Sequence, residues 1–297
     1  MAQLIKIENY ISRYEKDIFH YPGQFMRLKK VNYSKFEQAW ENQANNKSEV
    51  FSAKQKIKHI FSANDKTQTE DDLSDDTSKT TSVKELKQSF LDHLMPFQLK
   101  WASTTIGEMS FIDRYYYEDF KLKYFLQRIP DIYLLFYYPV FQLKQTSLDG
   151  EILLVSPVEI EIIKFVEMDS TMMIYPSEDR TWRLEKDSVQ STMLSPMISL
   201  NRTEQIVRSI LKKYKLDFPI KKIVLSRTNS ILVHNEPYNT RFIGKDQHEK
   251  WLHEKRSFVS PLKHAQLKVC EFLLKHCQTN AVRRPEWDQE VNGDQLY

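Results

Sequence analysis

The strongest structural signal in the chain is IYLLFYYPVFQL at residues 132–143, followed closely by EILLVSPVEIEIIKFVE at residues 151–167. Both stretches are rich in β-branched and aromatic residues, which favour strands. Asp149-Gly150 is typical of a turn, and Ser156-Pro157 divides the second stretch into two strands. Their near-continuous apolarity predicts strands that are buried on both faces of a sheet.

Helical patterns lie on both sides of these strands. Apolar residues recur at helical spacing before them, and after them Asn201-Arg202-Thr203-Glu204 matches a helix start, with Asn201 or Thr203 as the cap. A further strand is expected at residues 223–225, and residues 171–189 are expected to form a hairpin that contains Trp182. This order predicts a mixed α/β (α+β) protein.

The start of the chain is expected to be helical and basic. Five apolar residues recur at intervals of three and four, as in an amphipathic helix: Leu4, Ile7, Ile11, Tyr14 and Ile18. Residues 1–60 carry 11 basic residues against 6 acidic ones, so any electrostatic attraction for an anion is expected early in the chain. Aromatic residues and lysines alternate over residues 25–40, and the simpler interpretation is a buried aromatic face with solvated lysines.

Four segments follow from these patterns. A basic N-terminal helical segment over residues 1–64 precedes an acidic linker over residues 65–82, where Leu73 is the only large apolar residue. Such a stretch buries too little surface to offset its chain entropy and is predicted to be disordered. A plain spacer is the simpler role, and competition with an anionic ligand of the basic segment is the alternative. Residues 83–230 form the main domain, and residues 231–297 an extension with one helix.

Composition excludes several function classes. The five glycines cannot assemble a phosphate-binding loop or a dinucleotide fingerprint. His248 and His253 flank a glutamate but are five residues apart, which does not match the spacing of a zinc protease. Cys270 and Cys277 would lie about 10 Å apart along a helix, too far for a disulfide, which fits a reducing cytoplasm. No run of 18 apolar residues suggests a membrane span, and no membrane partner is expected.

Residues 103–230 resemble the nuclease-related domain (NERD) family. The matching features are Gly107-Glu108, expected to open a helix, the strand over 133–143, the segment Glu151 to Pro157 and the strand over 158–167. Trp182, Ser195-Pro196, the helix over 204–211 and the strand at 224–225 follow in the expected order.

The resemblance implies a restriction-endonuclease-like mixed sheet flanked by helices, here with the added N-terminal helical segment. It also implies a site in which a helical Glu, a strand Asp and a Glu on the next strand hold Mg²⁺ beside a lysine. The corresponding candidates here are Glu108, Glu151, Glu161 and Lys164, with Glu108 and Glu151 as metal ligands.

The sequence departs from this pattern where the metal would bind. Counted from Pro157, Lys164 stands where the strand Glu is expected and Val166 where the lysine is expected. Glu161 and Lys164 are three residues apart, which directs them to opposite faces of a regular strand. A β-bulge would repair this spacing. The simpler interpretations are a loss of catalysis, with no cofactor, or ordinary strand charges that face solvent.

Three functions remain open. The first is a degenerate nuclease-like domain that binds DNA or RNA weakly, through the basic N-terminal segment and five lysines: Lys212, Lys213, Lys215, Lys221 and Lys222. The second is an active Mg²⁺-dependent nuclease that uses Glu108, Glu151 or Asp149, Glu161 and Lys164 in a bulged arrangement. The third is a non-enzymatic scaffold or regulatory protein that binds another protein.

Deletion of the acidic linker, residues 65–82, tests the segment assignment. We expect the melting temperature to change by no more than a few degrees, and protease to cut this segment first, because it contains almost nothing to bury. A larger fall in the melting temperature would show that the linker is packed.

Overall fold

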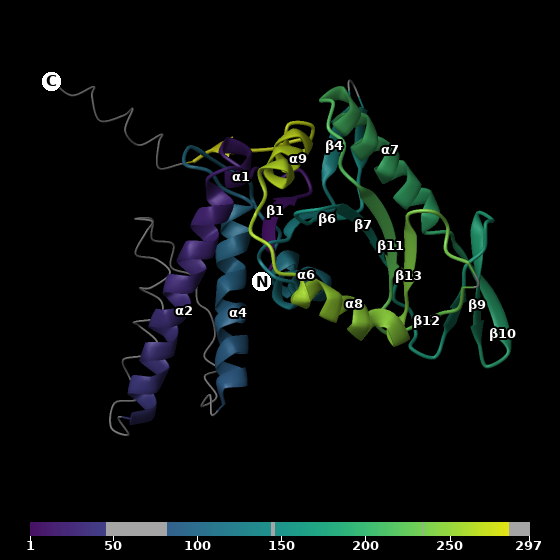
Figure 1. Cartoon of the computed structure of the whole chain (residues 1–297), viewed down its shortest axis with the longest axis horizontal. Coiled ribbons are helices and arrows are strands. Elements are labelled where there is room, and N and C mark those ends of the chain that lie inside the picture. The colour runs from purple at the N-terminus through teal and green to yellow at the C-terminus, as the bar shows by residue number, and fades with distance from the viewer. Residues whose placement is uncertain (46–81, 144–145, 234, 285–297) are drawn as a thin grey trace.

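The computed structural model describes residues 1–45, 82–143, 146–233 and 235–284, and its centre is a six-stranded mixed sheet (Figure 1). The strand order is β1-β3-β6-β7-β11-β13. The strands are β1 (Gln3–Ile7), β3 (Leu134–Tyr137), β6 (Ile152–Val155), β7 (Ile160–Phe165), β11 (Ile220–Leu225) and β13 (Thr240–Ile243). Three of them were expected from the two apolar stretches, in which Pro139 ends β3.

Strand direction changes in the middle of the sheet. β1 and β3 are parallel, β3, β6 and β7 form an antiparallel meander, and β7, β11 and β13 are parallel. One edge of the sheet runs across the strand ends. It therefore carries the ends of β1, β3, β7, β11 and β13 and the start of β6. Side chains from separate parts of the sequence meet there.

Helices cover both faces of the sheet. α7 (Met197–Lys213) and α9 (His264–Leu274) lie on one side, and α6 (Phe120–Arg128) and α8 (Lys245–Ser257) on the other (Figure 1). Because the inner strands are covered on both faces, β3 and β6 are buried at every residue. The predicted mixed α/β class, with a mixed sheet flanked by helices, is confirmed.

The predicted helix at the start of the chain is wrong. Residues 3–7 form β1, and the only helix before residue 20 is α1 (Arg13–Lys16). Pairing with β3 decides the outcome, because it buries all five residues of β1, whereas a surface helix buries one stripe. Lys6 is fully buried and donates to the carbonyl oxygen of Tyr10, to Glu15 Oε1 and to Thr279 Oγ1.

A helical hairpin lies beyond β1. It pairs α2 (Tyr21–Asn45) with α4 (Val83–Trp101), which begins with a capping box at Ser82 and Glu85 (Figure 1). Residues 65–81 of the predicted linker lie outside the described residues. Gln98 of α4 covers the free edge of β1: its Oε1 accepts from the Leu4 N–H at 2.7 Å, and its Nε2 donates to the Ala2 carbonyl at 2.9 Å.

Two other boundaries differ from expectation. α7 begins at Met197, after Pro196, and not at Asn201 or Thr203. Thr203 lies within the helix, where its hydroxyl donates to the Ser199 carbonyl. The expectation of one helix after residue 231 is also wrong, because both α8 and α9 lie there and β13 joins the main sheet.

A second, smaller sheet extends from the main one in the order β10-β9-β8-β12. Its strands are β8 (Met173–Tyr175), β9 (Thr181–Lys186), β10 (Val189–Leu194) and β12 (Ser230–Ile231). Trp182 on β9 is fully buried and contacts Phe242 of β13, which fixes the small sheet to the large one. The remaining elements are α5 (Tyr115–Glu118), β4 (Val140–Leu143), β5 (Thr146–Asp149), β2 (Glu108–Met109) and β14 (Val282–Arg283).

Cys270 and Cys277 are both free thiols, as expected from their spacing. Within the described ranges, no helix combines the length and the apolar character needed to cross a membrane.

Replacement of Gln98 tests the protection of the β1 edge. Gln98→Leu leaves the buried N–H of Leu4 and the buried carbonyl of Ala2 without partners, so we expect a loss of about 2–3 kcal/mol in the free energy of unfolding. Gln205→Leu on the exposed face of α7 is the control, with an expected change within about 0.5 kcal/mol. Equal effects in urea denaturation would contradict this role.

Candidate functional site

The two charged residues that the sequence singles out on β7 lie on opposite faces of the sheet. β7 pairs with β6 and β11 in continuous register from Ile160 to Phe165, so no bulge alters the alternation of its side chains. Lys164 therefore lies on the face covered by α7, and Glu161 on the face covered by α8. The bulged arrangement required for an active site does not form in this strand.

Glu151 and Lys164 form a cross-strand ion pair. Glu151 directly precedes β6 and lies opposite Lys164, whose Nζ is 2.7 Å from Glu151 Oε1. The Glu151 side chain is 6% exposed and that of Lys164 is 34% exposed, so the lysine reaches the buried carboxylate from the surface. The Glu151 N–H donates to Thr203 Oγ1 on α7. The carboxylate is thus already neutralised by a cation of the protein.

Glu161 forms a second, more deeply buried pair. Its Oε1 lies 2.5 Å from Nζ of Lys255 on α8, and the two side chains are 2% and 9% exposed. Burial raises the pKa of Glu161, and the charge of Lys255 opposes this shift. The Lys255 ammonium also lies 5.6 Å from the ring centre of Tyr133 and 5.7 Å from that of Trp251. No pattern in the sequence points to Lys255, which is separated from Glu161 by 94 residues.

Glu108 lies away from both pairs. The expected helix at Gly107-Glu108 is wrong, because Glu108 belongs to the two-residue strand β2, which pairs with β14. Its side chain is 44% exposed and lies 3.1 Å from Nζ of Lys16. Asp149 is the last residue of β5 and pairs with Val140 of β4, so it is an exposed strand residue and the interpretation as a turn residue is wrong.

The candidate carboxylates do not fit a Mg²⁺ site. Glu108, Glu151 and Glu161 each face a different lysine, and Glu151 and Glu161 are separated by the sheet. Among the described residues, no three His, Cys, Asp or Glu side chains form a group that could hold a metal ion. If Lys164 is instead taken as the lysine of the nuclease pattern, the residue two positions earlier is Ile162, which is fully buried. A strand carboxylate ligand is missing in either register.

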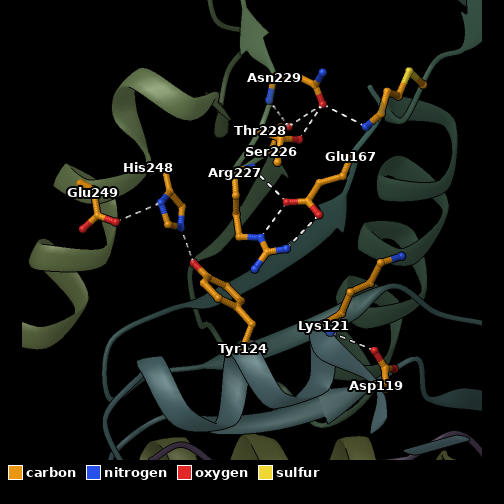
Figure 2. A network of polar contacts seen from close by, with 11 residues as sticks. Asp119, Lys121, Tyr124, Glu167, Ser226, Arg227, Thr228, Asn229, His248 and Glu249 are labelled. Atoms are coloured by element: carbon orange, nitrogen blue, oxygen red, sulfur yellow. Dashed lines mark hydrogen bonds and ion pairs between the residues drawn. The ribbon is translucent and has the colours of Figure 1, made fainter. Parts of the chain in front are cut away.

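A polar network that the sequence analysis missed lies at the ends of β7 and β11 (Figure 2). Arg227 binds Glu167 through two contacts, Nε to Oε1 at 2.6 Å and Nη2 to Oε2 at 3.0 Å. Its guanidinium lies 5.1–5.3 Å from the ring centres of Phe120, Tyr124 and Phe165. The signal in the sequence was Ser226-Arg227-Thr228-Asn229 directly after a strand.

The groups of this network bind one another. The Tyr124 hydroxyl lies 2.6 Å from His248 Nε2, and burial lowers the pKa of His248 (Figure 2). Asn229 Oδ1 accepts from the Met168 N–H, and its Nδ2 donates to the carbonyls of Asp169 and Met172. The network therefore holds the two sheets and α6 together, and Arg227 occupies both carboxylate oxygens of Glu167.

A groove lined by apolar and charged side chains lies between α2 and α4, with a volume of about 860 Å³. Its lining includes four cations and two carboxylates: Arg27, Lys29, Lys30, Lys87, Glu37 and Asp131. Lys29 pairs with Asp131, whereas the exposed Arg27, Lys30 and Lys87 form no ion pair within the described part of the chain. The simpler interpretation of residues 25–40 is confirmed for Phe25 and Phe36, which are core residues, and Arg27, Lys29 and Lys30 line the groove.

No family model matches the chain, and no solved structure matches it. A stretch of 41 residues is 46% identical to part of an RNA 2′,3′-cyclic phosphodiesterase of Geobacillus stearothermophilus. This stretch covers 14% of the present chain and 13% of that protein.

The buried pair between Glu161 and Lys255 predicts a pH-dependent loss of stability. Lys255→Met leaves Glu161 buried without a counter-charge, and we expect a loss of about 3–5 kcal/mol near neutral pH. Because the folded pKa of Glu161 is raised, the folded protein takes up a proton more readily than the unfolded chain. The loss should therefore shrink as the pH falls toward the unfolded value of about 4.3.

Two variants serve as controls for this measurement. Lys123→Met breaks the exposed pair with Asp92 and should cost no more than about 1 kcal/mol at any pH. Glu161→Leu combined with Lys255→Met removes both charges and should recover most of the stability. Denaturation curves from pH 5 to pH 8 that show the same loss throughout would refute a charged Glu161.

Proposed function

We propose that this protein is a degenerate, NERD-like nucleic-acid-binding protein that does not cleave its ligand. The observation that carries the proposal is the pairing of both strand carboxylates with lysines on opposite faces of the sheet. The order of elements in the main sheet, a meander of β3, β6 and β7 followed by α7 and a parallel β11, is compatible with the resemblance.

The absence of cleavage follows from electrostatics. A Mg²⁺ ion at Glu151 would have to displace or approach the ammonium of Lys164, which repels the cation and occupies one carboxylate oxygen. On the other face, Glu161 is almost fully buried beneath Lys255, so a hydrated metal has no access to it. Within the described part of the chain, no three His, Cys, Asp or Glu side chains come together to complete a hexacoordinate site.

Binding is assigned to the groove between α2 and α4. Phosphate groups attract lysine and arginine and release counterions when they bind. Arg27, Lys30 and Lys87 are available for this purpose because none of them forms an ion pair with a described residue. RNA belongs with DNA among the ligands to be tested, since the protein with the 41-residue match is named an RNA 2′,3′-cyclic phosphodiesterase. A cytoplasmic location stays a prediction of the sequence.

A cleavage assay tests the non-catalytic half of the proposal. We expect no Mg²⁺- or Mn²⁺-dependent cleavage of plasmid, linear or single-stranded DNA, or of RNA, above background, and no change in Glu108→Ala. Contaminating nuclease would not respond to substitutions in this chain. Activity that disappears in both Glu151→Gln and Lys164→Ala would therefore establish a true active site and replace this proposal.

A salt titration and two charge reversals test the binding half. If three phosphates are contacted, the affinity for duplex DNA should fall about 40-fold between about 50 and 200 mM salt. The triple variant Arg27→Glu, Lys30→Glu, Lys87→Glu should abolish binding, whereas Lys212→Glu, Lys215→Glu, Lys250→Glu, with the same change in net charge, should retain most of it. The reverse result would move the binding site to α7 and α8.

A further inference from the structure

One edge of the small sheet is left open. β10 pairs with β9 on one side, and no described strand pairs with its other side. Figure 1 shows β10 at the outer end of the molecule, on the side opposite the α2–α4 hairpin. An open edge is a template for another strand, because its N–H and carbonyl groups point outward without partners.

Both edges of the main sheet, in contrast, are closed by side chains. Gln98 binds the backbone of Ala2 and Leu4 along β1. On β13, the Phe242 N–H donates to Glu236 Oε1 at 2.8 Å. The other edge strand of the small sheet, β12, has only two residues. β10 is therefore the long edge strand that lacks protection within the described residues.

The hairpin turn identifies which backbone groups of β10 point outward. Asp187 and Ser188 both have positive φ angles, 49° and 65°, which is typical of the two-residue turn that links antiparallel strands. In such a hairpin Lys186 and Val189 exchange hydrogen bonds, and the bonding then alternates along the strand. The N–H and carbonyl groups of Gln190, Thr192 and Leu194 therefore face away from β9.

The sequence of β10 offers none of the usual protection against pairing. Its six residues, VQSTML, include no charge and no proline. Val189 and Leu194 at its two ends are large apolar residues that are 69% and 65% exposed. Charged residues and prolines are the common means by which edge strands avoid association. The neighbouring β9, by comparison, contains Arg183, Glu185 and Lys186.

We propose that β10 pairs antiparallel with β10 of a second copy of this chain, about a two-fold axis at Thr192. This register places Thr192 opposite Thr192 and Gln190 opposite Leu194 of the second copy. All three outward-facing residues then form hydrogen-bonded pairs, each exchanging two N–H···O bonds. Isologous pairing of this kind requires a strand that is complementary to itself, which an uncharged strand satisfies.

Electrostatics permit this arrangement. Arg183 lies opposite Thr192 in the β9–β10 pair, so the two side chains share one face of the sheet. On this face of the dimer, the nearest like charges are Arg183 and its symmetry equivalent. Three strand spacings separate them, about 14 Å, which exceeds the screening length of about 8 Å at physiological salt. A foreign peptide could pair with β10 through its backbone alone. A second copy pairs in the same way and also places its Gln190 over the exposed Leu194, which favours the second copy as the partner.

Sedimentation velocity on the full chain tests the dimer. A single strand pair buries little area, so we expect a weak dimer that forms as the concentration rises from about 5 to 500 µM. Thr192→Lys brings two ammonium groups together on the axis and should leave the protein monomeric over this range. Gln205→Lys, which adds the same charge on the exposed face of α7, should dimerise like the unaltered chain.

Thr192→Pro separates pairing from folding. The Thr192 N–H faces away from β9, so proline should keep the melting temperature within a few degrees and still abolish the dimer. An unaltered chain that stays monomeric at about 500 µM, or a Thr192→Lys dimer of unchanged affinity, overturns the proposal.

Disulfide trapping tests the register. Thr192→Cys should form a cross-linked dimer under mild oxidation, because residues in hydrogen-bonded antiparallel pairs have Cα atoms about 5.5 Å apart. Gln190→Cys should not, because the two Gln190 residues would lie four positions apart along the strands, about 14 Å. Cross-linking of Gln190→Cys in preference to Thr192→Cys would exclude the axis at Thr192.

Discussion

Alternation of side chains along β7 is the constraint from which the rest of the account follows. Because β7 is regular from Ile160 to Phe165, Glu161 and Lys164 must lie on opposite faces, each facing a different layer of helices. Each charge then needs its own counter-charge where little water is present. Lys164 pairs with Glu151 beside α7, and Glu161 pairs with Lys255 on α8. A sheet that could bring these groups to one metal ion instead holds two separate ion pairs.

The charged groups of the main sheet and the cations of the α2–α4 groove lie in different parts of the molecule. The two ion pairs hold strands and helices together, and so does the network of Arg227 and Glu167 at the edge where β7 and β11 end. Three exposed cations that form no ion pair with a described residue, Arg27, Lys30 and Lys87, line the groove of the α2–α4 hairpin at the other side of β1. Under the proposed function, the α2–α4 hairpin binds the polyanion and the main sheet acts as its rigid support.

The sequence was sufficient for those features that depend on neighbouring residues. The strands at Leu134–Tyr137 and Ile152–Val155 follow from continuous apolar runs, and the opposite faces of Glu161 and Lys164 follow from their spacing. β1 was mistaken for a helix because Leu4, Ile7 and Ile11 fit a helical period, and only its pairing with β3, some 130 residues later, selects a strand. Lys255 could not be assigned to Glu161 for the same reason, since the polar sequence of α8 gives no sign that one lysine is buried.

Binding of Mn²⁺, followed by electron paramagnetic resonance of the free ion, tests the central claim most directly. Mn²⁺ prefers the same oxygen ligands as Mg²⁺ and reports binding without any need for cleavage. We expect no saturable site below about 1 mM Mn²⁺, because Lys164 and Lys255 already neutralise the two strand carboxylates. A site of one ion per chain that is lost in Glu151→Gln would contradict it.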